Sequence, residues 1–126
     1  MVDGTHAIID ADDADRARAF LRDTLGLPFV DAHGGWPIFK LPPAALGIHP
    51  AGNPGEPSTG PPRGHQEIYL MCDDIVATVE DLTRPGVTFT TPVQDQGFGR
   101  LVRFVIPGAG EIGLYQPRHD TAYDLE

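Results

Sequence analysis

The chain is poor in cysteine, in positive charge and in long apolar runs. Its single cysteine, Cys72, excludes an internal disulfide, and its apolar neighbours predict a buried side chain rather than a reactive thiol. Nine lysines and arginines against eighteen aspartates and glutamates leave a net charge of −9, which argues against a nucleic-acid or anionic-membrane partner. No apolar stretch approaches the length of about 18 residues that a membrane span needs, and no signal peptide is recognisable. We therefore expect a cytoplasmic protein whose default partner is a small organic molecule.

Motifs of several enzyme classes are also missing. The sequence contains no phosphate-binding loop, no nucleophile elbow and no paired-cysteine metal motif. At 126 residues, the chain fits one compact domain that is large enough to fold without disulfides.

One pattern occurs twice along the chain. A strand-like run begins at His6 and again at Glu67, and six positions later each run reaches an acidic helix start. The turn glycines Gly26 and Gly86 follow 20 and 19 positions after these two residues. We interpret the pattern as two copies of one strand-helix-strands unit within a single domain. The predicted layout is a first module at about 5–50, a connector at 50–64, a second module at about 65–117 and a polar tail at 118–126.

Each module is predicted to contain one strand, one helix and three further strands. Asp12 or Asp13 can cap the first helix and Asp74 the second, and a glycine ends each of them. The connector holds five prolines and four glycines in fifteen residues, a composition that excludes a helix and interrupts a sheet. The predicted strands cover residues 6–10, 29–30, 36–41 and 46–49 in the first module, and 67–72, 87–90, 100–106 and 111–115 in the second.

Strand alternation selects three candidate metal ligands. Glu67 points away from the face that the helix would cover, and so do His6 and His49 in their strands. A carboxylate within an apolar strand is costly to bury unless it is paired, protonated or bound to a metal. Two imidazoles and one carboxylate suit a divalent ion such as Fe, Mn, Zn or Ni.

Each of these ligands has a second interpretation. Glu67 can instead form an ion pair with an arginine such as Arg103, and His6 or His49 can face solvent. Arg103 itself is either a buried anion anchor or a surface residue of its strand. His65, two residues before Glu67 on the same face, can replace a ligand, orient Glu67 or lie at the loop edge.

Aromatic side chains are the second group of candidate site residues. Tyr69 and Tyr115 share the faces of the candidate ligands, and either can donate a hydrogen bond or line a pocket. We take Glu67 and Tyr115 as the catalytic candidates. The loop 95–99 has glycines on both sides of Phe98. It is predicted to be either a lid that places Phe98 over a ligand or an ordinary hairpin turn whose aromatic ring caps the core. The candidate substrate-binding residues are Trp36, Tyr69, Phe98, Arg103 and Tyr115.

Four segments of the chain carry a family resemblance: Thr5-His6, Asp15-x-x-x-Ala19-Phe20-Leu21-x-x-x-Leu25-Gly26-Leu27, Gly64-His65-x-Glu67-Ile68-x-Leu70 and Pro107-Gly-x-Gly110-x-Ile112-x-Leu114-Tyr115-x-Pro117. Together they resemble the vicinal oxygen chelate superfamily, which includes glyoxalase I, fosfomycin and bleomycin resistance proteins and extradiol dioxygenases. The resemblance runs from Thr5 to Pro117. It implies an α+β fold of two βαβββ modules that form a cupped mixed sheet.

The resemblance also implies ligand positions. The first-strand slots fall on His6 and Glu67, and the last-strand slots on His49 and Gly113. Since Gly113 cannot ligate a metal, the four-ligand pattern of glyoxalase I-like members is incomplete. Two histidines and one glutamate match in kind the fosfomycin-resistance and dioxygenase members. Members of this superfamily often pair as homodimers, which is the expected state here.

Two functions are consistent with these residues. The first is a divalent-metal-dependent enzyme of the dioxygenase, lyase or isomerase type, which chelates its substrate through adjacent oxygens. The alternative is a metal-free antibiotic- or metabolite-binding protein of the bleomycin-resistance type, with Trp36, Phe98, Tyr69 and Tyr115 as its apolar pocket.

Overall fold

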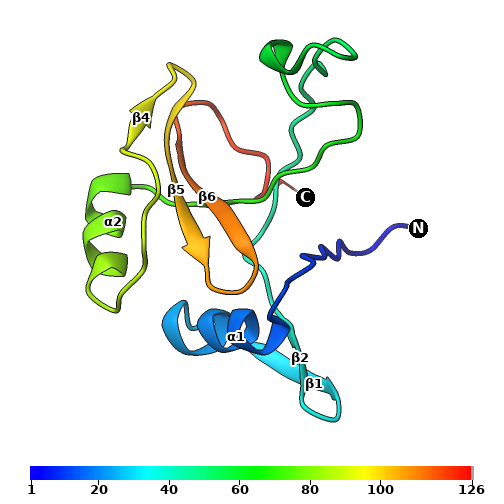
Figure 1. The fold of residues 1–126 in the computed structure, drawn as a ribbon, viewed down its shortest axis with the longest axis vertical. Helices are drawn as coiled ribbons and strands as arrows, with labels where there is room; N and C mark the ends of the chain where they lie inside the picture. Colours follow the sequence, from blue (N-terminus) through cyan, green and yellow to red (C-terminus); the bar gives the residue numbers. More distant parts are fainter. Residues whose placement is uncertain (126) are drawn as a thin grey trace.

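The computed structural model describes residues 1–125 and has the mixed α+β architecture that the sequence predicted (Figure 1). None of its helices in this range is long and apolar enough to cross a membrane. In chain order the elements are α1 (Ala14–Ala19), η1 (Phe20–Thr24), β1 (Phe29–His33), β2 (Trp36–Phe39), η2 (Pro57–Thr59), β3 (Tyr69–Met71), α2 (Ile75–Thr83), β4 (Gln94–Asp95), β5 (Gly99–Ile106) and β6 (Gly110–Pro117).

The main sheet has four strands in the order β3-β6-β5-β4. Strands β5 and β6 form a long antiparallel hairpin, paired from Gly99 and Pro117 at one end to Ile106 and Gly110 at the other. Strand β3 lies parallel to β6, with Tyr69 opposite Gly113, and β4 continues the sheet beside β5. Strands β1 and β2 form a separate two-stranded hairpin, which lies beside α1 in Figure 1.

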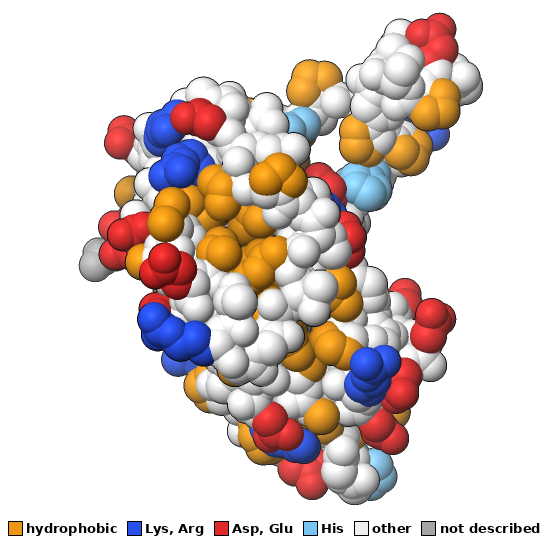
Figure 2. All heavy atoms as spheres, turned by 60° about the vertical axis from the view of Figure 1, so that its left-hand side comes forward, with side chains coloured by type: hydrophobic (Ala, Val, Ile, Leu, Met, Phe, Trp, Pro, Cys, Tyr) orange, Lys and Arg blue, Asp and Glu red, His pale blue; other side chains and the backbone are white. Residues whose placement is uncertain are grey.

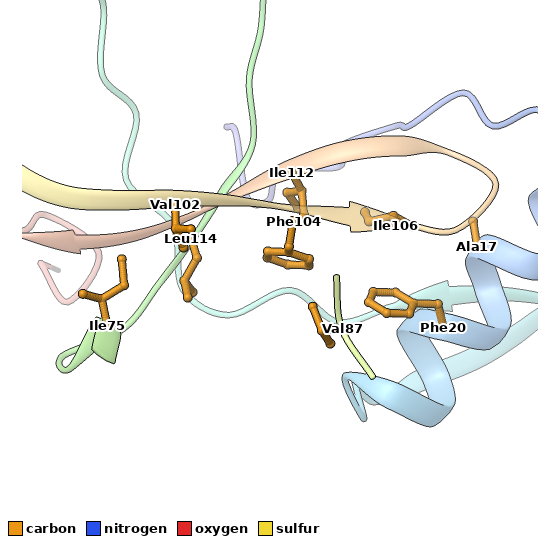
Figure 3. Packing of buried hydrophobic residues seen from close by; sticks show 9 residues of the cluster. All are labelled: Ala17, Phe20, Ile75, Val87, Val102, Phe104, Ile106, Ile112 and Leu114. Carbon is orange, nitrogen blue, oxygen red and sulfur yellow. The ribbon is translucent and has the colours of Figure 1, made fainter. Parts of the chain in front are cut away.

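Alternate side chains of β5 and β6 build the hydrophobic core. Val102, Phe104 and Ile106 of β5 and Ile112 and Leu114 of β6 are all buried on the helix side of the sheet (Figure 3). They pack with four further buried side chains from the helices and the segment after α2, namely Ala17, Phe20, Ile75 and Val87. The intervening residues of both strands therefore face the opposite, open side of the sheet.

Both main helices start and end as the sequence predicted. The Asp13 side chain accepts a hydrogen bond from the Arg16 N–H at 3.1 Å, and Asp74 caps α2 in the same way through the Ala77 N–H at 3.1 Å. Gly26 and Gly86 adopt φ values of 68° and 102° after the helices, a left-handed conformation that glycine reaches without strain.

Several predicted strands, two in the first module and one in the second, are not formed as expected. Residues 6–10 and 46–49 have no strand structure, and the expected strand at 87–90 is reduced to a single bridge between Phe89 and Phe104. A strand is stabilised by a hydrogen-bonded neighbour, and within residues 1–125 the segments 6–10 and 46–49 have no strand partner. Residues 87–90 do contact β5, but only around Phe89. The side chains of Ile8, Leu46 and Ile48 are accordingly 76%, 86% and 84% exposed.

The connector is irregular, as predicted. Its only regular element among the described residues is η2, and it stands away from the main sheet (Figure 1). In the space-filling view it projects from the body as an arm, while hydrophobic side chains gather in a band on the face turned forward (Figure 2).

Candidate functional site

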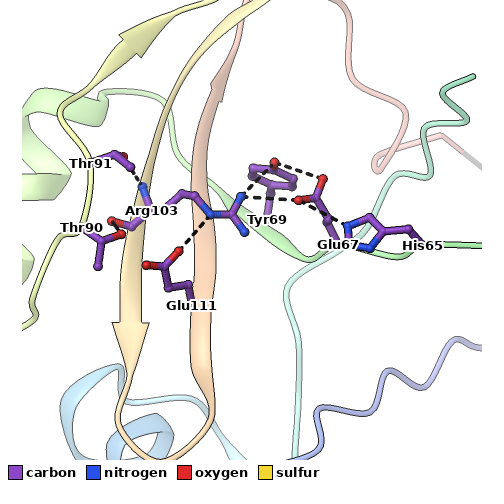
Figure 4. Close-up of polar contacts among 7 residues, drawn as sticks. All are labelled: His65, Glu67, Tyr69, Thr90, Thr91, Arg103 and Glu111. Atoms are coloured by element: carbon purple, nitrogen blue, oxygen red, sulfur yellow. Dashed lines mark hydrogen bonds and ion pairs between the residues drawn. The ribbon is translucent and has the colours of Figure 1, made fainter. Parts of the chain in front are cut away.

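The open face of the main sheet carries half of the predicted site residues, together with Glu111, which the sequence did not single out. Glu67 precedes β3, Tyr69 lies in β3, Arg103 in β5 and Glu111 in β6 (Figure 4). Tyr115 also lies in β6. The partly buried side chains of residues 68, 70 and 72 pack against the core on the other face. The alternation that the sequence predicted for this strand is therefore confirmed.

Arg103 is the centre of the polar cluster. Its Nη1 lies 3.5 Å from Glu67 Oε1, and its Nε lies 3.4 Å from Glu111 Oε2. Nη1 also donates to the Tyr69 hydroxyl at 3.3 Å (Figure 4). The Arg103 N–H donates to the Thr91 hydroxyl at 3.1 Å, which anchors the strand behind the guanidinium. Glu67 thus has the arginine partner that was the alternative to a metal.

The charges around Arg103 hold it in the protonated form. Burial lowers the pKa of the guanidinium, but Tyr69, Glu67 and Glu111 together outweigh burial and raise this pKa above its ordinary value. Two carboxylates and one guanidinium leave one unbalanced negative charge in the cluster, and the molecule as a whole also carries excess negative charge.

His65 lies beside Glu67 rather than in a ligand position of its own. Its Nε2 is 3.7 Å from Glu67 Oε1, while the Tyr69 hydroxyl donates to Glu67 Oε2 at 3.4 Å. Both Glu67 oxygens therefore have polar neighbours from its own segment, and these neighbours restrict its orientation (Figure 4).

An aromatic group adjoins the polar cluster and centres on Tyr115. The centroid of its ring lies 6.1 Å from those of Tyr69 and Phe98 and 5.8 Å from that of His119. His119 Nδ1 lies 2.7 Å from the Asp120 carbonyl, so Nδ1 carries the proton. Its Nε2, 2.8 Å from the Tyr115 hydroxyl, can then accept a hydrogen bond from that hydroxyl, which also lies 3.4 Å from the Phe98 carbonyl. Burial raises the pKa of Tyr115.

Sequence reasoning missed His119. It lies in the predicted polar tail 118–126, and its separation from Tyr115 by four positions gives no signal because the segment after β6 has no regular period. The structure places it against Tyr115 because the chain turns back directly after Pro117.

The segment 95–99 forms a hairpin turn between β4 and β5. Asp95 pairs with Arg100 across the turn, and its carboxylate accepts a hydrogen bond from the Gly97 N–H at 3.0 Å. Arg118 forms an ion pair with Asp95 and donates its N–H to the Phe98 carbonyl at 2.9 Å. The Phe98 side chain is half-exposed at the rim of the aromatic group, so it does not cap the core. Its movement as a lid stays a prediction.

Trp36 is not brought to this face. It lies in the separate β1–β2 hairpin, where the Arg18 guanidinium stands 4.5 Å from the centroid of its ring. This cation–π contact joins the hairpin to α1.

The residues as arranged here do not fit a metal ion. His6 and His49 lie in exposed irregular segments, and no group of three or more His, Cys, Asp or Glu side chains within residues 1–125 is placed to hold an ion. The Oε1 atom of Glu67 lies 3.5 Å from Arg103 Nη1, so the guanidinium stands where a metal ion would have to approach that oxygen. Position 113, the remaining slot implied by the resemblance, is covered by the Tyr69 ring, since a Cβ there would lie 2.9 Å from Tyr69 Cγ. The predicted ligands His6, His49 and Glu67 are therefore not brought together in this arrangement, and the metal site stays a prediction.

A protein-family model ties the sequence to known proteins. The model described as the Glyoxalase/Bleomycin resistance protein/Dioxygenase superfamily matches residues 5–113. The chain belongs to this superfamily. No curated protein matches it.

Solved structures agree with the superfamily assignment. A superfamily member from Sphaerobacter thermophilus is 27% identical, with a TM-score of 0.59 over 90% of this chain and 97% of that one. The antibiotic-binding protein TnmS3 from a Streptomyces species is 24% identical, with a TM-score of 0.56 over 86% and 90% of the two chains. A lactoylglutathione lyase from Agrobacterium tumefaciens is 21% identical, with a TM-score of 0.52 over 90% and 95%. The last two likenesses show the fold alone.

Proposed function

We propose that this protein binds a small organic cation without a metal, on the open face of the main sheet. The observation that carries the proposal is the position of Arg103 between Glu67 and Glu111, with Tyr69 beside it. The guanidinium takes the place beside Glu67 that a metal would need. The superfamily contains bleomycin resistance proteins by name, which is consistent with a binding role.

Charge and shape define the ligand class. The cluster holds one more carboxylate than cations, and Glu67 and Glu111 are only partly covered, so each has room for a further hydrogen-bond donor. The rings of Tyr69, Tyr115 and Phe98 supply an adjoining apolar surface. A flat molecule with a positively charged or hydrogen-bond-donating end matches both parts.

Titration with the flat fluorescent cation proflavine tests this proposal. We expect saturable binding that weakens in Glu67→Gln, which removes the charge while keeping the shape, and that persists in EDTA. Glu80→Gln is the matched control, because Glu80 is an exposed carboxylate on α2. The proposal is wrong if proflavine does not bind saturably, if Glu80→Gln weakens binding equally, or if EDTA abolishes it.

The alternative hypothesis, a metal-dependent enzyme, predicts a different metal content in the purified protein. If His6, His49 and Glu67 hold a divalent ion, freshly purified protein should contain metal, and His49→Ala should contain much less. The metal-free proposal predicts an equally low metal content in both proteins. Elemental analysis of the two proteins, purified side by side without chelator, separates the two functions.

We further propose that the protein acts as a homodimer in which a second copy covers the first module. The support is the exposure of Ile8, Val30, Leu46 and Ile48, all within the first 50 residues, together with two segments of strand-like sequence that have no strand partner among the described residues. We expect light scattering to give a dimer mass for the wild type and a monomer mass for Ile48→Asp. Val76→Asp, at an exposed position of α2, should remain dimeric. A monomeric wild type, or dissociation in both variants, would contradict the proposal.

A further inference from the structure

The open face contains two glycines whose missing side chains make room for two tyrosine rings. A Cβ at Gly113 would overlap the ring of Tyr69, and a Cβ at Gly99 would overlap the ring of Tyr115. Neither glycine has a positive φ, so backbone conformation does not require glycine at either position. Glycine is required there because a tyrosine ring occupies the space that a side chain would fill.

The two positions differ in what surrounds them. At Gly99 the added Cβ would also lie 2.8 Å from the Gln116 carbonyl oxygen, so a larger residue would strain the backbone as well as the ring. At Gly113 the nearest atoms all belong to Tyr69, which lies directly opposite in β3. Gly113 therefore acts on one neighbour alone and is the cleaner position to test.

The Tyr69 ring is also the link between the two parts of the site. Its hydroxyl contacts both Arg103 and Glu67, at 3.3 Å and 3.4 Å, while its ring meets the Tyr115 ring edge to face. If the ring stood up from the sheet, it would lose these contacts and fill the space above Arg103. The position of this one ring thus determines how far the surface beside Arg103 stands out from the sheet.

We propose that Gly113 is a specificity-determining position that acts through Tyr69: by leaving its side-chain space empty, it lets the tyrosine ring lie flat and form the floor for a flat ligand. This inference rests on the proposed binding function. It makes Gly113 a positioning residue rather than a contact residue. A side chain at position 113 narrows the site to smaller ligands because the displaced ring occupies the space of the ligand.

A double-mutant cycle with proflavine tests the inference. We expect Gly113→Ala to weaken binding about tenfold, in line with the loss of one aromatic contact. In the Tyr69→Ala background the same substitution should change the dissociation constant less than about twofold, because its effect passes through the ring. Val102→Ala is the control for general destabilisation, since Val102 is buried on the helix side. It should lower the melting temperature and leave the dissociation constant unchanged.

Equal weakening by Gly113→Ala in both backgrounds overturns the inference, and so does a loss of affinity in Val102→Ala that matches the loss in Gly113→Ala. A ligand-free measurement keeps this test separate from the binding function. The Tyr69 ring above Gly113 should shift the Gly113 Hα resonances upfield in NMR spectra, and Tyr69→Ala should abolish that shift. If the shift is present but proflavine does not bind to the wild type, the binding function fails while the ring geometry holds. If the shift is absent, the floor is not formed and the inference is wrong.

Discussion

Residues 65–117 supply seven of the nine buried core side chains, whereas residues 1–64 supply only Ala17 and Phe20. The two modules nevertheless begin with the same strand-like pattern. In the second module the long strands β5 and β6 are joined by the tight turn 107–109, so each finds its partner immediately along the chain. In the first module the prolines 42 and 43 separate the end of β2 from the next strand-like run. A strand pattern produces a sheet only where the connections allow pairing.

The largest expected difference between the modules is in core stability. Phe104→Ala should lower the free energy of unfolding by about 3–5 kcal/mol, because Phe104 is fully buried at the centre of the sheet. Ile48→Ala should change it by less than about 0.5 kcal/mol in a monomer, because Ile48 is exposed. Urea denaturation at low protein concentration measures both. A large cost for Ile48→Ala would mean that the first module is covered in solution.

The sequence predicted the ends of both helices and the side-chain alternation around Glu67 well, because these signals are local. The caps Asp13 and Asp74, the turn glycines and the two-residue alternation around Glu67 each depend on neighbouring residues only, and all of them are confirmed. The expected strands 6–10 and 46–49 failed because strand formation depends on a distant partner that no local pattern specifies.

For the candidate site too, the sequence predicted local features but not contacts between distant segments. Alternation placed Glu67 and Tyr69 on one side of the sheet and left the role of Arg103 open, and the ion pair between Glu67 and Arg103 was the stated alternative to a metal. The contribution of Glu111 was not foreseen, since its distance from Arg103 follows from the register of β5 against β6. The contact of His119 with Tyr115 depends on how the chain turns back after the last strand.

A smaller difference in the free energy of unfolding is expected between substitutions of two partly buried arginines, one in each module. Arg103→Ala removes the partner of two carboxylates and should cost about 1–2 kcal/mol of unfolding free energy. Arg18→Ala removes one exposed ion pair with Asp15 and the contact with Trp36, and should cost about 0.5–1 kcal/mol. Thermal and urea unfolding of the two variants test whether Arg103→Ala costs more stability than Arg18→Ala. If Arg18→Ala costs more, the β1–β2 hairpin contributes more to stability than its exposed position indicates.

Local mobility gives a third comparison, between the β4–β5 turn and the connector. The Gln96 N–H donates to the Gly99 carbonyl at 2.9 Å, and the Asp95 carboxylate binds both the Gly97 N–H and Arg118. Arg118→Ala should therefore speed amide hydrogen exchange in residues 96–98 several-fold. Exchange in the connector 50–64 should stay the same.

Arg84→Ala is the matched control for this exchange experiment. It also removes an exposed ion pair, the contact between Arg84 and Asp81 at 3.0 Å, but it lies at the C-terminal cap of α2. If it speeds exchange in residues 96–98 as much as Arg118→Ala does, the effect is general and the segment after β6 does not hold the turn. Ligand binding should slow exchange there if the turn acts as a lid.

The smallest expected effect is a difference in pH dependence between two aspartates. Hydrogen bonds from Arg118 and the Gly97 N–H hold the pKa of Asp95 below 3.8, and a hydrogen bond from Arg22 lowers the pKa of Asp23 in the same direction. Arg22 stays next to Asp23 in the unfolded chain, whereas Asp95 loses Arg118 on unfolding. Only the Asp95 shift therefore contributes fully to folding stability.

A lowered folded pKa stabilises the protein above the unfolded value, and this contribution is lost as the pH falls through the folded pKa. Asp95→Asn should therefore lower the melting temperature relative to the wild type at about pH 6, and the difference should shrink below about pH 3. Asp23→Asn should show a smaller difference at both values, because its partner is equally near in the unfolded chain. Circular dichroism melting curves of the three proteins at the two pH values test this. Equal pH dependence in the two variants would mean that the ion pair between Asp95 and Arg118 adds no more stability than a contact between sequence neighbours.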